Sequence, residues 1–318
     1  MSNAPHLKYF NLEASVRPDM ANGHLWQRFV HSLLVFHFKF HISITDIHST
    51  LDSFRTPFWL EEKHWYVTYF DDTLFSIPHF IPTHMTALDY LFFLSTAPDH
   101  SFLSSHVNAL TLDTMSTGIN KRLPNIRTLI LARNMKKFTR VKLTMSFHQV
   151  NHLSIYSFDQ LVTIMPLENL LPQLSNLTIR DRITIEMIEH IRSFRLPQIR
   201  ILELGTHLSH RQIGSILEEL FHLFPNLEQL RYKSYIASVD LMLRLIHGFP
   251  HLSSAFFRAS LIFFRKNEQF CRNPNLFLRN LSHANFHQTI CRMHHSNNTQ
   301  QSFYIDWTIQ KRVCVILA

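Results

Sequence analysis

Histidine and cysteine side chains near the C-terminal end have the types and spacing that could hold a metal ion. They are Cys271, His283, His287, Cys291, His294 and His295. If residues 278–295 are helical, His283, His287 and Cys291 share one face at i, i+4 and i+8, and thiolate and imidazole are ligands that zinc prefers. However, no C-x-x-C pair accompanies them, and 23 histidines are spread along the chain. We therefore interpret the cluster as a consequence of composition and predict neither a metal nor another cofactor.

A second candidate is a run of basic residues at 121–142. It contains Lys121, Arg122, Arg127, Arg133, Lys136, Lys137, Arg140 and Lys142, and no acidic residue lies between Asp113 and Asp159. Such a run could bind nucleic-acid phosphates or an acidic protein. Because no known nucleic-acid-binding module and little aromatic interleaving accompany it, we favour a solvated edge of the fold. Binding of nucleic acid or an acidic partner through 121–142 is the alternative function.

The motifs of common enzyme classes are absent from the sequence. G-x-S-x-G, H-E-x-x-H, G-x-G-x-x-G and the P-loop motif do not occur, and the chain has only 5 glycines. The paired acids Glu61/Glu62 and Asp71/Asp72 are typical of solvated turns. We therefore predict that the protein is not an enzyme.

Cysteine content and hydropathy indicate the compartment. Three cysteines cannot build a disulfide framework, no secretory signal is visible at the start, and no apolar run reaches about 18 residues. We predict a cytoplasmic or nuclear protein without a membrane partner.

A repeated phrase indicates the elements that must position any functional residue. LPNIRTLIL (123–131) returns as LPQLSNLTI (171–179), LPQIRILEL (196–204) and FPNLEQLRY (224–232), in the pattern P-x-L-x-x-L-x-L. From Pro124 to Pro250, with one copy that lacks the proline, the steps are 24, 24, 25, 28 and 25 residues. The alternation at the end of each phrase predicts a short strand with one buried face, and the proline suits the entrance of that strand.

The segments between the phrases have helical periodicity. Residues 184–194, 210–224 and 239–249 each place apolar residues on one face. A unit of helix, proline turn and strand cannot bury its apolar face alone, whereas stacked units can.

The spacing and the pattern resemble those of leucine-rich-repeat proteins, whose units run 20–29 residues. The family's L-x-x-L-x-L-x-x-N pattern is complete once, at Ile126, Leu129, Leu131 and Asn134. The units are closer to the irregular repeats of F-box/leucine-rich-repeat proteins, although the F-box itself is absent. The resemblance implies an α/β fold, a curved solenoid with parallel strands interrupted by one aromatic-rich insertion.

We expect four segments along the chain. They are first irregular repeats at 1–40, an aromatic β-rich insertion at 41–105, the leucine-rich-repeat solenoid at 106–260 and a C-terminal capping segment at 261–318. A repeat strand stands near the start with no polar cap before it, so either an N-terminal module has been lost or another element covers this edge. The alternating tail from Ser302 is expected to add a strand that closes the other end.

Alternation along the strands also predicts a binding face. If the apolar set points inward, its neighbours line the open side of the sheet. The resemblance then implies a non-enzymatic scaffold that binds a protein partner, and it is compatible with the target-recognition part of an F-box-type ubiquitin-ligase adaptor. Basic residues bias this face toward an acidic partner, with an aromatic anchor. The candidate partner-binding residues are Asn176, Thr178, Arg180, Glu203, Gln229, Arg231, Lys233, Phe256 and Arg258.

Overall fold

The computed structural model describes residues 7–86, 89, 93–98, 105–113, 125–135, 147–163, 171–189, 194–205, 213–236, 238–260, 289–295 and 302–309. The chain divides into two compact units. The first comprises Met1–Arg127 and Val141–Gln149, and the second comprises Thr128–Arg140 and Val150–Ala318. Within the described ranges, no helix is long and apolar enough to cross a membrane.

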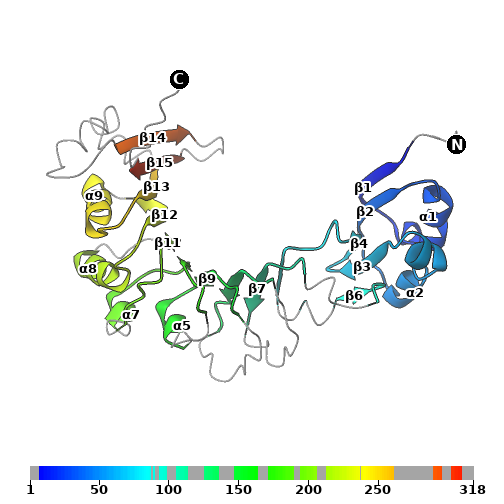
Figure 1. The fold of residues 1–318 in the computed structure, drawn as a ribbon, viewed down its shortest axis with the longest axis horizontal. Helices are drawn as coiled ribbons and strands as arrows, with labels where there is room; N and C mark the ends of the chain where they lie inside the picture. The colour runs from blue at the N-terminus through cyan, green and yellow to red at the C-terminus, as the bar shows by residue number, and fades with distance from the viewer. Residues whose placement is uncertain are drawn as a thin grey trace. The chain divides into compact units, whose positions relative to one another are not determined.

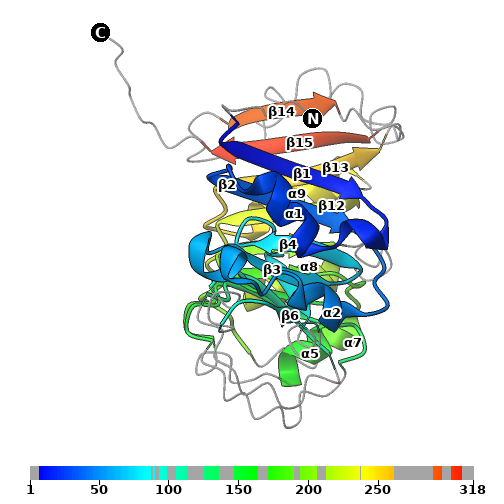
Figure 2. The same cartoon turned by 90° about the vertical axis from the view of Figure 1, so that its right-hand side faces the viewer.

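The first unit is built on a five-stranded sheet in the order β1–β2–β4–β3–β6 (Figure 2). Only β1 and β2 pair in parallel, and the other neighbours are antiparallel. β5 and β7, which do not belong to this five-stranded sheet, pair in parallel. The bounds are β1 (Tyr9–Ser15), β2 (Val35–His41), β3 (Tyr66–Phe70), β4 (Thr73–Ile77), β5 (His84–Thr86), β6 (Leu94–Ser95) and β7 (Ala109–Leu112).

The stretch expected to be β-rich contains a hairpin. β3 and β4 pair antiparallel and are joined by Asp71 and Asp72. Both aspartates have positive φ, 48° and 50°. A two-residue hairpin loop with two positive φ values matches the right-handed twist of the strands, and aspartate tolerates this conformation.

Aromatic residues form the core of the first unit. Phe36, Phe38 and Phe40 alternate along β2, and each is at most 1% exposed. Trp59, also fully buried, packs near Phe36 and donates its indole N–H to the carbonyl of Gly23 at 3.2 Å. The surrounding helices are η1 (Pro18–Met20), α1 (Gly23–Val30), α2 (Ile47–Asp52) and the π-helix η2 (Phe58–Glu62).

The expected boundary at residues 40/41 falls inside β2, so the first two predicted segments share one sheet. The physical reason is the core: the aromatic face of β2 is buried by Phe54 and Trp59, which come from the stretch expected to be an insertion. The sequence pattern located both pieces but did not show that they pack together.

The second unit contains six parallel strands that neighbour one another in chain order, from β8 to β13. Pro172, Pro197, Pro225 and Pro250 each stand four residues before a strand, which confirms the prediction for these prolines, whereas Pro124 lies outside the described residues. The bounds are β8 (Thr128–Leu131), β9 (His152–Ile155), β10 (Asn176–Ile179), β11 (Ile201–Leu204), β12 (Gln229–Ile236) and β13 (Ser254–Ser260).

Helices join these strands and lie on one side of them (Figure 1). They are α5 (Phe158–Thr163), α7 (Ile185–Glu189), α8 (Ile213–Leu223) and α9 (Val239–Gly248), the last three in segments predicted to be helical. The predicted inward residues are at most 1% exposed, which confirms the strand register: they are Leu177, Ile179, Leu202, Leu204, Leu227 and Leu230.

A buried glutamine ties together two consecutive units of this sheet. Gln160, 3% exposed, donates from Nε2 to the carbonyls of Ala132 at 2.7 Å and Met135 at 3.1 Å. Its Oε1 accepts from the backbone N–H of Tyr156 at 2.7 Å. The side chain thereby satisfies backbone groups in the turn after β8 and the turn after β9, groups that would otherwise be buried without partners.

The C-terminal part departs from the expected single closing strand. β15 (Ser302–Ile309) does pair with β13, but antiparallel, and β14 (Thr289–His295) pairs with its other side. β14 also bears on the metal hypothesis, because Cys291, His294 and His295 lie in a strand, not in the helix that would align a ligand set. Cys271, His283 and His287 lie outside the described residues.

Candidate partner-binding face

Strand register in the second unit places the outward residues in two rows across β9 to β13. The first row is His152, Asn176, Ile201, Gln229 and Ser254, and the second is Ser154, Thr178, Glu203, Arg231 and Phe256. Neighbouring strands in such rows are about 4.8 Å apart. We call these rows, together with Arg180, Lys233, Tyr235 and Arg258, the open face, because the described helices lie on the other side of the sheet (Figure 1).

The open face is hollowed over β11, β12 and β13. An open pocket of about 460 Å³ is lined by Glu203, Gln229, Leu230, Arg231, Lys233, Ser254, Ala255 and Phe256. Five predicted partner-binding residues therefore share one pocket: Glu203, Gln229, Arg231, Lys233 and Phe256. The other four, Asn176, Thr178, Arg180 and Arg258, do not line it.

The part of the open face over β9 and β10 is closed by its own hydrogen bonds. His152 Nε2 lies 2.9 Å from the hydroxyl of Thr178, and Arg180 donates from Nε to the Ser154 hydroxyl at 2.9 Å. Ser154 and Thr178 are consequently buried, at 2% and 7% exposure, although they point away from the helices. Thr178, one of the candidate partner-binding residues, therefore has its hydroxyl within hydrogen-bonding distance of His152 and little exposed surface.

The basic residues of the open face differ in the groups that their charged atoms contact. Lys233 forms an ion pair with Glu203 at 2.7 Å, and Glu203 is the more buried member, with 17% of its side chain exposed. The guanidinium of Arg258 lies over the Tyr235 ring at 4.5 Å, and that of Arg180 lies 5.7 Å from the Tyr156 ring. Arg231 is exposed and is opposite Glu203 and Phe256 in register.

A bulge in β12 shapes the pocket. Register with β13 runs from Tyr232, opposite Phe257, directly to Tyr235, opposite Arg258. Lys233 and Ser234 therefore have no partner residue on β13, and Lys233 instead reaches Glu203 on β11. Bulges of this kind re-aim a side chain beside a binding surface. Tyr235 was missed from the sequence although it is two residues after Lys233, so extending the alternation by one step would have found it.

The alternative basic segment is mostly outside the described residues. Of its members, Arg127 and Arg133 are described, and both are exposed. Arg133 lies 3.5 Å from the Asp181 carboxylate. Within the described part of the chain, no three histidine, cysteine or acidic residues gather as a metal site would require.

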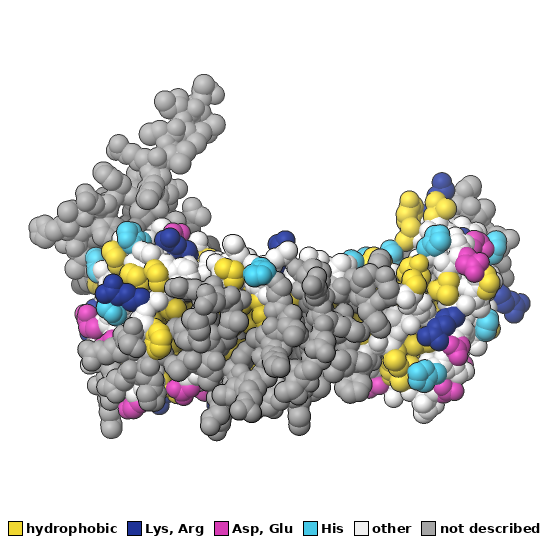
Figure 3. All heavy atoms as spheres, turned by 60° about the horizontal axis from the view of Figure 1, so that its bottom comes forward, with side chains coloured by type: hydrophobic (Ala, Val, Ile, Leu, Met, Phe, Trp, Pro, Cys, Tyr) yellow, Lys and Arg dark blue, Asp and Glu magenta, His cyan; other side chains and the backbone are white. Residues whose placement is uncertain are grey.

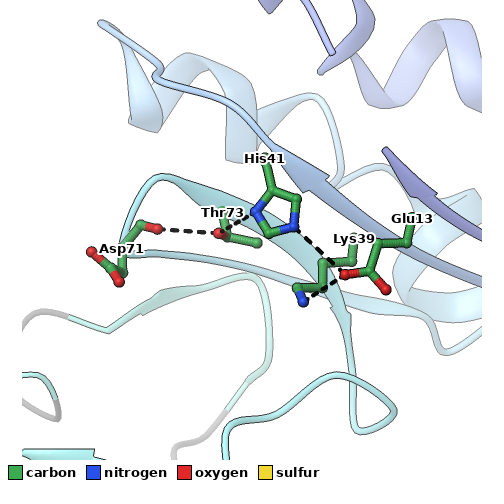
Figure 4. Close-up of polar contacts among 5 residues, drawn as sticks. All are labelled: Glu13, Lys39, His41, Asp71 and Thr73. Atoms are coloured by element: carbon green, nitrogen blue, oxygen red, sulfur yellow. Dashed lines mark hydrogen bonds and ion pairs between the residues drawn. The ribbon is translucent and has the colours of Figure 1, made fainter. Parts of the chain in front are cut away.

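A polar cluster also lies on the sheet of the first unit (Figure 4). Glu13 contacts Lys39 at 2.7 Å and His41 Nε2 at 3.5 Å, and Thr73 Oγ1 lies 3.4 Å from His41 Nδ1. Hydrogen bonding to Lys39 and its charge lower the pKa of Glu13. The order of an acid, a histidine and a hydroxyl is that of a catalytic triad, but the Thr73 hydroxyl donates to the Asp71 carbonyl at 3.1 Å. We interpret the cluster as cross-strand pairing.

His152 should make the stability of the second unit depend on pH. Burial lowers the pKa of His152 below its ordinary 6.5; Glu203 opposes this shift, whereas Arg180, Arg231 and Lys233 favour it. Since the unfolded chain binds a proton on this residue below about pH 6.5 and the folded chain binds it only at lower pH, stability should fall as pH drops below about 6.5.

His152→Gln should reduce this loss, because glutamine keeps a donor for Thr178 but does not titrate. The measurement is the free energy of unfolding in urea at about pH 7.5 and about pH 5.5. The exposed His251, in the same unit, supplies the control substitution, His251→Gln. An equal loss of stability in the wild type and His152→Gln would contradict the assignment.

Comparison with known proteins leaves the chain without an assigned family. No protein-family model matches it, and no curated protein matches it either.

Proposed function

We propose that the second unit is a curved solenoid of the leucine-rich-repeat type and acts as a protein-binding scaffold without enzymatic activity. Three features support this proposal. The strands from β8 to β13 follow one another as parallel neighbours, the helices join them on one side, and the units recur at 24 to 28 residues. Gln160 bridges consecutive turns much as the family's asparagines do, although the asparagine of the one complete repeat pattern, Asn134, is exposed.

The pocket over β11 to β13 carries the functional part of the proposal. It combines two cations, Arg231 and Lys233, with the aromatic Phe256 and the amide Gln229. Glu203 balances Lys233, and among the described residues Arg231 has no ion pair, so we assign its charge to a ligand. An acidic side chain beside an apolar one, on an extended peptide or the edge of a small domain, is the complementary partner.

The proposed role in a ubiquitin-ligase adaptor rests on the family resemblance alone. In F-box/leucine-rich-repeat proteins such a solenoid recognises the target of a ubiquitin-ligase adaptor, and we extend this role to the present chain as part of the proposal. A cytoplasmic or nuclear location belongs to the same proposal.

The test is neutralisation of the two pocket cations, Arg231→Gln together with Lys233→Gln. Arg231 and Lys233 are the more informative pair because both line the pocket, whereas Arg180 and Arg258 do not. Capture of the specific protein partner should weaken about 10-fold, and the remaining binding should depend less on salt. Capture from lysate is quantified by mass spectrometry and then repeated with the purified partner.

The matched control is Arg195→Gln with Arg200→Gln, which removes the same charge outside the open face. Arg200, like Lys233, is paired with a glutamate, Glu228 at 3.2 Å. Equal loss of capture in both double variants would contradict the proposed pocket. Loss of all partners after nuclease treatment would instead support the alternative, a solenoid that binds nucleic acid.

A further inference from the structure

The strand β1 ends the five-stranded sheet of the first unit among the described residues. All seven of its residues pair with β2 without a bulge. Natural edge strands are usually blunted by shortness, proline, lysine or a bulge, because unpaired backbone groups invite another strand. β1, with the sequence YFNLEAS, is seven residues long and contains no proline, lysine or bulge, and Glu13 is its one charged residue.

The direction of the free backbone groups follows from the hydrogen bonds to β2. Lys8 accepts from the N–H groups of Leu34 and Val35, and the N–H of Val16 donates to His41. Alternate residues of a strand direct their N–H and C=O groups to the same side, so the even-numbered residues face β2. The backbone groups of Tyr9, Asn11, Glu13 and Ser15 therefore point away from the sheet.

Exposed apolar side chains concentrate in the same part of the chain. The ring centroid of Trp26, in α1, lies 5.4 Å from that of Phe36 and 6.4 Å from that of Phe29. Phe10 of β1 stacks on Phe36 with 5.8 Å between the ring centroids. A continuous aromatic group thus runs from β1 to Phe29, which is 63% exposed. Figure 3 shows hydrophobic side chains at the surface of this unit. Within the described residues, the large hydrophobics classed as exposed are Leu7, Tyr9, Met20, Leu25, Phe29 and Leu34.

We propose that β1 is a dimerisation edge, on which a second copy of the chain adds its own β1 antiparallel, centred on Leu12. Only this register overlaps all seven residues. It places Tyr9 opposite Ser15 of the second copy and Asn11 opposite Glu13, which are the residues with free backbone groups. Each such pair exchanges two backbone hydrogen bonds.

Side chains on both faces of β1 match in this register. On the apolar face, Leu12 meets Leu12 of the second copy, and the large Phe10 meets the small Ala14. On the polar face, the Asn11 amide can donate to the Glu13 carboxylate of the second copy. The two Glu13 carboxylates are not opposite each other in this register. Each is also paired with Lys39 of its own chain, at 2.7 Å. The arrangement is isologous, as a two-fold dimer requires.

Asn11→Pro tests the proposal with little expected harm to the fold. Because the N–H of Asn11 points away from β2, proline removes a donor from the free edge and none from the sheet. Sedimentation of the full chain under reducing conditions, from about 1 to 100 μM, should show a dimer for the wild type. Asn11→Pro should weaken dimerisation at least about 10-fold, whereas the control Asn11→Ala should remain dimeric.

Amide exchange supplies a second readout that does not depend on a variant. The amides of Tyr9, Asn11, Glu13 and Ser15 should exchange more slowly as the wild-type concentration rises, because dimerisation pairs them. A monomeric wild type throughout the concentration range would overturn the proposal. A dimer that Asn11→Pro leaves intact, with no concentration-dependent protection of these amides, would also overturn it and place the interface elsewhere.

Discussion

Leu202→Ala should lower the free energy of unfolding of the second unit by about 2–5 kcal/mol. Leu202 is 0% exposed and lies in β11, between Leu177 of β10 and Leu230 of β12, which are its partners in register. The smaller side chain leaves a cavity that closely packed neighbours cannot fill, so the lost transfer energy and the cavity add together.

The adjacent residue Ile201 is the control for this prediction. Ile201 points to the open face and is only partly buried. Ile201→Ala should therefore cost clearly less than Leu202→Ala. Urea unfolding followed by circular dichroism, with hydrogen exchange of the β11 amides, measures both. Equal costs, or a larger cost at Ile201, would show that the strand register is off by one.

Gly23→Ala should destabilise the first unit by about 1–3 kcal/mol. A Cβ at Gly23 would lie 2.3 Å from the carbonyl oxygen of Ser53 and 2.9 Å from the Phe54 ring. The Gly23 N–H also donates to the Ser53 hydroxyl at 2.8 Å, and its carbonyl accepts from Trp59 at 3.2 Å. Backbone on both sides must move to admit one methyl group, so these hydrogen bonds and the burial of Trp59 are lost together.

Gly214→Ala, in α8, is the matched control. There the nearest atom to a new Cβ is Arg244 Nη2 at 3.7 Å, an ordinary contact. The same substitution should stabilise this helix by about 0.4–1 kcal/mol, since alanine loses less conformational freedom than glycine. Tryptophan fluorescence with Trp307, the one tryptophan of the second unit, replaced by phenylalanine follows the first unit through Trp26, Trp59 and Trp65, and circular dichroism follows both units. A neutral Gly23→Ala would contradict the close packing of α1 against Ser53.

The solvent-facing edge of the first unit was partly foreseeable. A repeat strand without a polar cap near the start predicted an edge that needs covering. The sequence could not show which backbone groups are free, because that depends on the pairing of Lys8 and Val16 with β2. Nor did the aromatic pattern of β2 reveal that Trp59 and Phe54, from beyond the expected boundary, complete its core.

The sequence by itself determined where the short strands of the second unit follow their prolines and which leucines point inward, whereas their parallel pairing was expected only from the family resemblance. The strand positions and the inward leucines are local features: alternation has a period of two, and a proline acts on its own position in the chain, so neither requires knowledge of distant residues. The same alternation predicted that Glu203, Gln229, Arg231, Lys233 and Phe256 point outward, and the structure shows that these five residues line one pocket.

Only the tertiary structure decided which outward residues are available to a ligand. Thr178 and Ser154 alternate correctly yet are buried, because His152 and Arg180 reach across from the neighbouring strand to bond them. The bulge after Tyr232 sends Lys233 to Glu203 on β11, 30 positions earlier in the chain. Such contacts join residues that are distant in sequence, and their geometry depends on how neighbouring strands align. A periodic pattern predicts the direction in which a side chain points. It does not predict which neighbouring residue covers that side chain or neutralises its charge.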